Sequence, residues 1–255
     1  MRKSTLSILL CLSLLPALSA HASGPAQILE SYVEDFRKDP AAGETEVTFG
    51  VKIEGSGAWH VDIDRAGGVN LRDGLPPEPT FLYVTDPATL RRMDRGELAV
   101  ITAMGRARSS DPAPMDFELM EGYAPPEDFM AFFTPFTFHF WTRGFPETVR
   151  FGKEEFTRKV HGANVTAFYY QKGFRSAWYQ IKKGQHINQR AEDQVNPFPT
   201  LAIFIAGEAE ARIGGEQMKL EEGVSVLIPA GVTHEFWNDR EQPAEFIIIM
   251  FGEGA

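Results

Sequence analysis

The sequence predicts two folded domains, an α+β domain in the first half and an all-β domain in the second. The first observation is size, because 255 residues with 43% hydrophobic side chains are more than one small domain needs. The second is a change of hydrophobic pattern near the middle of the chain. The first half combines alternating strands with capped helices, whereas the second half contains short strands separated by glycine and proline turns.

The start of the chain has the pattern of a signal peptide. Two basic residues precede an apolar stretch at residues 6–18, and Ala20 and Ala22 supply the small residues of a cleavage site. We therefore expect residues 1–22 to be removed and the protein to be periplasmic, with secretion as the alternative. No transmembrane segment would then remain, and the only cysteine, Cys11, would leave with the peptide. An uncleaved anchor is the other interpretation, although the stretch is shorter than the ~20 apolar residues of a spanning helix.

Residues 23–145 are predicted to form the α+β domain. An apolar stripe indicates a helix at residues 28–37. Between residues 47 and 63, apolar side chains alternate with polar ones on either side of a glycine turn, which predicts a hairpin with one buried face. Two short strands follow, and Asp86 is placed to cap a helix that ends at Gly96.

This order of elements resembles the sterol carrier protein domain. The resemblance is carried by Thr85 and Asp86, by Gly96, Glu97 and Leu98, and by Ala103, Met104, Gly105 and Arg106. It implies a fold in which an apolar tunnel between the sheet and the helices holds a lipid. The sequence departs from the family at residues 109–114, where two prolines indicate a turn inserted into an expected strand.

Aromatic side chains are concentrated at residues 129–141, which hold six phenylalanines and a tryptophan. These rings either line an apolar cavity, with Phe132 and Phe136 as ligand contacts, or fill the core. Pro135 predicts that the segment changes from helical to extended close to it. His139 lies within the cluster and is interpreted as a core histidine.

Residues 146–162 are predicted to be a linker, because charged residues return there, and residues 163–255 to be a barrel. Short strands separated by glycine and proline turns predict a sandwich or small barrel. The expected strands lie at residues 166–170, 177–181, 201–205, 209–213, 223–228 and 245–251.

The strongest motif of the chain lies in this second domain. The spacing of the second cupin motif is present at Gly223, Pro229, Gly231, His234 and Asn238. Residues 203–208 are similar to the end of the first cupin motif, so the resemblance covers about residues 163–253. It implies a jelly-roll barrel, and in metal-binding cupins the histidine at the position of His234 is a metal ligand.

The first cupin motif is substituted at the positions of its ligands. Arg190 and Glu192 stand where the His-x-His pair is expected, and Thr200 stands where the glutamate is expected. We therefore expect a barrel without a metal ion, because one histidine cannot hold one. The alternative is a divalent transition metal held by His186, Glu192 and His234, which strand alternation would bring to one face. Arg190 would share that face and oppose the charge of the metal.

Without a metal, the barrel interior still predicts a ligand pocket. The expected lining consists of Trp178, Phe204 and Phe236 as walls and of Arg190, Glu192 and His234 as polar contacts. Arg190 is suited to bind a carboxylate through two parallel hydrogen bonds. Alternation would turn Tyr179 and Trp237 outward.

Three functions fit these observations. The first is an exported non-enzymatic binding protein of the cell envelope, with an apolar or lipid-like ligand in the N-terminal domain and a small-molecule or dimerisation role for the barrel. The second is a metal-dependent oxygenase or isomerase, and the third is a structural or interaction module without ligand. The substituted ligand positions favour the first over the second. The formal charge of -10 argues against a nucleic-acid partner, and unpaired barrel edges predict a homodimer.

Overall fold

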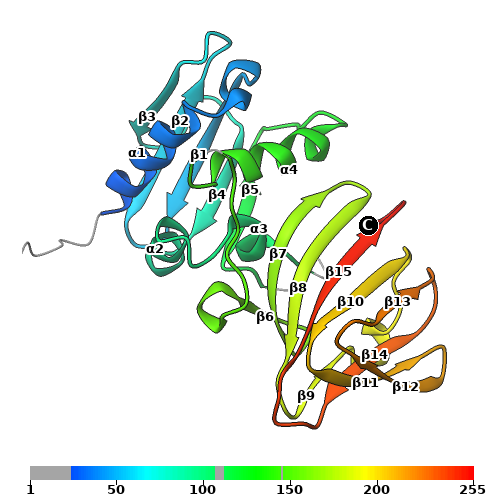
Figure 1. Ribbon diagram of the computed structural model, residues 1–255. Helices are drawn as coiled ribbons and strands as arrows, with labels where there is room; N and C mark the ends of the chain where they lie inside the picture. Colours follow the sequence, from blue (N-terminus) through cyan, green and yellow to red (C-terminus); the bar gives the residue numbers. More distant parts are fainter. Residues whose placement is uncertain (1–23, 107–111, 145) are drawn as a thin grey trace, which may run out of the picture.

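The computed structural model describes residues 24–106, 112–144 and 146–255. The predicted signal peptide at residues 1–22 and part of the predicted turn, residues 109–111, lie outside this range. The described chain forms an α/β half and a β-rich half that meet side by side (Figure 1). None of the helices in the described ranges is long and apolar enough to cross a membrane.

The N-terminal half is built on one five-stranded sheet. Its strand order is β3-β2-β1-β4-β5, in which β1 is parallel to β4 and the other neighbours are antiparallel. The strands are β1 (Val47–Ile53), β2 (Gly57–Ile63), β3 (Val69–Asp73), β4 (Phe81–Thr85) and β5 (Met115–Leu119). The predicted hairpin between residues 47 and 63 is confirmed.

Four α-helices accompany this sheet. They are α1 (Pro25–Phe36), α2 (Pro87–Asp94), α3 (Val100–Met104) and α4 (Phe129–Phe140), with a short 3₁₀ turn, η1 (Pro40–Glu44), after α1. The expected cap of α2 is confirmed, because the Asp86 side chain accepts hydrogen bonds from the amides of Ala88 and Thr89 at 2.7 and 3.1 Å. Helix α1 buries the predicted apolar stripe against the sheet.

The aromatic segment is a single helix, so the prediction of a break at Pro135 is wrong. Helix α4 runs through Pro135 without ending. A proline inside a helix costs about 3 kcal/mol. Burying a phenylalanine ring contributes about 1.5–3 kcal/mol, and five rings of α4 are buried, so the packing outweighs the proline. Those five rings are Phe129, Phe133, Phe136, Phe138 and Phe140.

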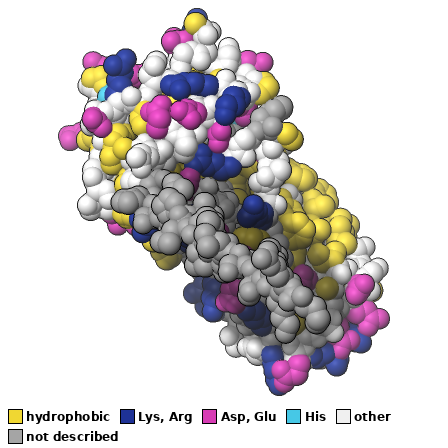
Figure 2. Space-filling view, turned by 60° about the vertical axis from the view of Figure 1, so that its left-hand side comes forward, with side chains coloured by type: hydrophobic (Ala, Val, Ile, Leu, Met, Phe, Trp, Pro, Cys, Tyr) yellow, Lys and Arg dark blue, Asp and Glu magenta, His cyan; other side chains and the backbone are white. Residues whose placement is uncertain are grey.

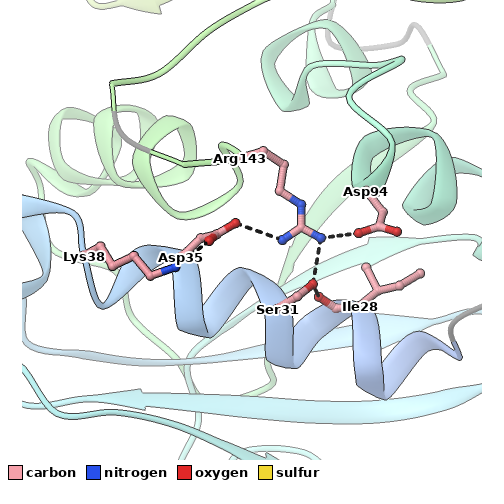
Figure 3. Close-up of polar contacts among 6 residues, drawn as sticks. All are labelled: Ile28, Ser31, Asp35, Lys38, Asp94 and Arg143. Carbon is pink, nitrogen blue, oxygen red and sulfur yellow. Dashed lines mark hydrogen bonds and ion pairs between the residues drawn. The ribbon is translucent and has the colours of Figure 1, made fainter.

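Arg143, just after α4, makes polar contacts with two other helices (Figure 3). Its guanidinium donates hydrogen bonds to Asp35 at 3.2 Å and to the Ser31 hydroxyl at 2.7 Å, both on α1, and to Asp94 at the end of α2. It also lies 3.9 Å from the centre of the Tyr32 ring. One partly buried cation therefore joins α1, α2 and the end of α4.

The C-terminal half is a barrel of two antiparallel sheets. The six-stranded sheet has the order β13-β10-β15-β8-β7-β6 and the four-stranded sheet the order β12-β11-β14-β9. The strands are β6 (Arg158–Val160), β7 (Ala163–Gln171), β8 (Phe174–Ile181), β9 (Gln185–Ile187), β10 (Thr200–Ala206), β11 (Glu208–Ile213), β12 (Glu216–Glu221), β13 (Ser225–Ile228), β14 (His234–Asn238) and β15 (Ala244–Phe251). Two 3₁₀ turns, η2 (Glu154–Phe156) and η3 (Ala191–Asp193), lie before β6 and after β9. The six-stranded sheet thus begins at Arg158, inside the linker predicted at residues 146–162.

Backbone geometry explains the motif that predicted the barrel. Gly223 and Gly231 have φ values of 84° and 78°, which side-chain-bearing residues rarely adopt. The Asn238 side chain donates to the carbonyls of Ile181 and Gln242, each at 2.9 Å, and accepts from the Arg240 amide at 2.8 Å. The Asn238 side chain therefore stabilises the turn between β14 and β15.

The two halves pack through α3, α4 and β7. The Ala167 amide on β7 donates to the Thr102 hydroxyl on α3 at 2.8 Å, and Arg158 donates to the carbonyl of Ala103 at 2.9 Å. Phe138 of α4 meets Tyr169 of β7 edge to face, with ring centres 5.5 Å apart. These contacts place α3 and α4 beside β7, as Figure 1 shows.

Candidate functional site

A cavity of about 410 Å³ begins inside the barrel and continues between the two halves. On the barrel side it is lined by Tyr179, Ile187, His234, Phe236, Ile248 and Met250. The N-terminal half contributes Met104, Phe117, Met130, Phe133 and Thr137. The barrel interior is therefore closed on one side by helices of the other half, and the two pockets expected from the sequence are one space.

His234 supplies a hydrogen-bond acceptor in the barrel part of the cavity. Its Nδ1 lies 3.1 Å from the carbonyl of Val232, so Nδ1 carries the hydrogen and donates it there. Nε2 is then the unprotonated nitrogen and lies 3.4 Å from the Asn196 amide nitrogen. Burial lowers the pKa of His234, because desolvation disfavours the imidazolium. The side chain is therefore neutral at neutral pH.

Tyr179 supplies a phenol to the same space. Its ring stacks on Phe246 with centres 5.6 Å apart, which holds it on the inner face of β8. Burial raises the pKa of Tyr179 to about 12, and the nearby Arg175 opposes this shift only in part. The phenol therefore remains protonated and can donate a hydrogen bond.

Charged groups lie toward the junction of the halves. The guanidinium of Arg175 lies over the rings of Tyr170 and Phe198, with distances of 4.6 and 5.3 Å to the ring centres. It also donates to the carbonyl of Gly254 at 3.3 Å. Arg106 pairs with Asp116 on β5. The cavity thus has mostly apolar walls, with the neutral polar groups of Tyr179 and His234 inside the barrel and charged side chains elsewhere in its lining.

Three of the predicted ligand contacts line this cavity, namely Glu192, His234 and Phe236. Trp178 does not, because Ala177 and Tyr179 are the residues of β8 that face inward. The Trp178 indole donates to Glu245 at 3.3 Å and contacts Phe151 from the segment before the barrel. The prediction therefore reversed the faces of Trp178 and Tyr179.

Four other predicted contacts lie away from the cavity lining. Phe204 packs on Phe246 in the barrel core, and Phe136 packs in the core of the N-terminal half. Phe132 is exposed and stacks on Phe136, with ring centres 5.2 Å apart. Arg190 is exposed and donates to Asp193 at 2.8 Å, so its predicted role toward a carboxylate ligand is not supported.

The donor set predicted for a metal does not come together. Strand β9 ends at Ile187 and Asn188 has a φ of 56°, so alternation does not extend from His186 to Glu192. His186 pairs with Trp237 on the opposite face from His234, and its Nε2 lies 2.9 Å from Glu235. His234 instead faces Asn196. One imidazole with amide and hydroxyl neighbours does not fit the donor set of a cupin metal centre.

Sequence reasoning missed most of the wall that the N-terminal half supplies. Met130 and Phe133 belong to the aromatic segment, but the choice between ring positions depends on how α4 packs against β7. Tyr179 was missed because both faces of β8 are covered. Ala177 lies on the same inner face as Tyr179, but a small apolar residue does not by itself indicate which face of a strand points inward.

A comparison with protein families gave a match within the barrel. The model of the cupin domain family matches residues 179–250. No curated protein matches the chain at a significant level. Among solved structures, the chain is similar to the plu4264 protein from Photorhabdus luminescens, with 17% identity over 42% of this chain and 88% of the other and a TM-score of 0.37.

Two further solved structures have the same kind of similarity. A Cupin 2 conserved barrel domain protein from Salinispora arenicola has 15% identity over 41% of this chain and 88% of its own, with a TM-score of 0.36. A predicted oxalate decarboxylase from Thermotoga maritima has 13% identity over 35% of this chain and 79% of its own, with a TM-score of 0.32. The match to the cupin domain family thus falls within the barrel formed by the two antiparallel sheets, which follows an N-terminal α/β region.

Proposed function

We propose that this protein is an exported, non-enzymatic binding protein of the cell envelope, whose cavity holds a mostly apolar, uncharged, lipid-like small molecule. The observation that carries the proposal is the continuous cavity of about 410 Å³ with walls from both halves. This volume lies in the range of sites that bind drug-sized molecules. One ligand would contact both halves at once, in place of two ligands in separate pockets.

The chemistry of the lining supports this class of ligand. Met104, Met130 and Phe133 form an apolar wall on one side. At the barrel end, His234 offers an acceptor and Tyr179 a donor, and both are neutral at neutral pH. A hydroxyl or carbonyl group bound there would satisfy these groups without burying a charge.

The remaining parts of the proposal rest on the sequence. The signal-peptide pattern of residues 1–22 supports export to the periplasm, with secretion as the alternative. The substituted first cupin motif supports a binding role without metal chemistry, since a barrel can keep its shape after losing its ligands. The resemblance of the first half to the sterol carrier protein domain supports a lipid-like ligand.

A displacement titration tests whether the cavity binds such a molecule. The neutral fluorescent probe phenylnaphthylamine is bound to the purified protein and then displaced by decanol. Ala177→Phe adds a ring beside Tyr179 inside the cavity, so we expect both affinities to fall about tenfold or more. Ser225→Phe, at an exposed position of β13, is the control and is expected to leave both unchanged. No displacement in the wild type, with no lipid in solvent extracts, would favour a structural module.

His234→Ala tests the polar end of the same cavity. Loss of one hydrogen bond of roughly 1 kcal/mol is expected to lower the affinity for decanol about fivefold and to leave the affinity for the apolar probe unchanged. Because burial lowers the pKa of His234, decanol affinity of the wild type should stay constant at neutral pH and fall only below the usual histidine range of about 6.5. The variant should lack this fall. Equal losses for decanol and probe would contradict the assigned acceptor.

We further propose a homodimer through the outer face of the larger barrel sheet. The outward side chains of β10, β13 and β15 include five apolar residues: Leu201, Ile203, Leu227, Ile247 and Ile249. Figure 2 shows hydrophobic side chains gathered on one flank of the barrel half. These five positions carry no charge, so two copies can meet there without opposing like charges. That matters in a chain of net charge -10.

Light scattering in solution measures this association. Leu227 is 56% exposed on β13, the edge strand of the proposed contact, and Leu227→Glu is expected to convert the dimer to a monomer because it would bury a charge. Leu75→Glu, at a 49% exposed position of the N-terminal half, is the matched control and should remain dimeric. A monomeric wild type at micromolar concentration would overturn the proposal.

A further inference from the structure

Three side chains that could bind a metal ion meet in the N-terminal half, away from the ligand cavity. They are Asp39 before η1, His139 in the last turn of α4, and Glu147 in the segment that leads from α4 to the barrel. One donor atom from each lies within 4.8 Å of the other two. None of the three lines the cavity. Asp39 lies 100 residues before His139 in the sequence, so only the fold brings it to the other two.

The Asp39 carboxylate is held in place by its own backbone. Its Oδ1 accepts a hydrogen bond from the Ala41 amide at 2.8 Å, as the cap of η1. Its Oδ2 is then turned to the histidine ring and lies 3.0 Å from His139 Nδ1. The Asp39 side chain is only 6% exposed. A buried carboxylate oriented by a second hydrogen bond is the usual arrangement of a metal ligand.

Glu147 faces the same ring nitrogen but does not receive a hydrogen bond from it. His139 Nδ1 contacts Glu147 Oε1, but one ring nitrogen carries one hydrogen, and the aligned hydrogen bond goes to Asp39. Within the described part of the chain, Glu147 Oε1 is buried and has no hydrogen-bond partner. Two carboxylates therefore share one imidazole, which leaves at least one negative charge without compensation. A cation between the three donors would remove this deficit.

We propose that Asp39, His139 and Glu147 bind a divalent transition metal of the zinc type. One imidazole nitrogen and two carboxylate oxygens are donors that zinc accepts at about 2.0–2.2 Å, whereas calcium and magnesium prefer oxygen alone. The His139 side chain is 34% exposed, so water can complete the coordination. The ion would tie the segment after α4 to η1, and the interpretation of His139 as a core histidine is replaced. This site is independent of the cavity and of the function proposed for it.

Calorimetric titration of the chelator-treated protein with Zn²⁺ tests the site. We expect one equivalent to bind to the wild type and the affinity to fall at least about 100-fold in His139→Gln. His186→Gln and His234→Gln remove the histidines of the barrel and should leave stoichiometry and affinity unchanged, which separates this site from the cupin position. Absent binding, or binding lost only in the barrel variants, would overturn the proposal.

Glu147→Gln provides a second variant in case His139→Gln does not fold. It keeps the shape of the side chain, and we expect it to lower Zn²⁺ affinity by about tenfold or more. Bound Co²⁺ should give visible absorption bands in the wild type that change in Glu147→Gln, because a carboxylate ligand is lost. Circular dichroism confirms that the variant is folded. An unchanged Zn²⁺ affinity together with an unchanged Co²⁺ spectrum would exclude Glu147 as a ligand and overturn the three-residue site.

Discussion

Phe49→Ala is expected to destabilise the N-terminal half by about 3–5 kcal/mol, the range found for removing a buried phenylalanine. Phe49 is fully buried on β1. Its ring meets Phe81, Tyr83, Phe136 and Phe140 with centres 4.8–5.7 Å apart, so it joins the sheet to α4. Urea unfolding followed by circular dichroism measures the loss. Such a loss is a large part of the stability of a domain of ordinary size.

Phe132→Ala is the matched control for this prediction. It also removes a phenyl ring, but from α4 and at a position that is 38% exposed. There the stack on Phe136 is the main contact. We expect a loss below about 1 kcal/mol. Equal losses in the two variants would show that the aromatic cluster does not form the core of this half. Binding of decanol should survive in Phe132→Ala, since Phe132 does not line the cavity.

The parts of the fold that follow from local backbone chemistry could be predicted from the sequence. Gly223 and Gly231 adopt positive φ values, and His234 begins β14 where the motif placed it. The cap of α2 at Asp86 has the same origin, because a carboxylate one residue before a helix binds the free amides of its first turn. Such features depend on a few neighbouring residues, so a short stretch of sequence is enough to predict them.

The site required information that no local pattern contains. Alternation along β8 separates Trp178 from Tyr179, but it does not say which faces inward when Phe151 covers the outer side. Alternation after His186 fails because β9 ends at Ile187. The shared cavity depends on α4 packing beside β7, which is a tertiary contact. Residues whose role is set by distant segments were therefore the ones misassigned.

Arg143→Met is expected to destabilise the N-terminal half by roughly 2–3 kcal/mol. The substitution keeps the length of the side chain and removes its charge, so Asp35 and Asp94 lose their common cation (Figure 3). Only 25% of the Arg143 side chain is exposed, and removing the cation from partly buried carboxylates costs more than breaking an exposed ion pair would, even though Asp35 keeps its contact with Lys38 at 3.1 Å. The contact over the Tyr32 ring is lost as well. Urea unfolding of the purified variant gives the value.

Arg143→Lys distinguishes the geometry of the contact from its charge. A lysine ammonium restores one positive charge but cannot reach Asp35, Ser31 and Asp94 together, because it lacks the planar fork of the guanidinium. We therefore expect it to recover less than half of the loss. Arg95→Met, in an exposed pair with Glu97, is the control and should leave the stability almost unchanged. If Arg143→Met cost no more than this control, the cation would not join the three helices, and their packing would depend on apolar contacts alone.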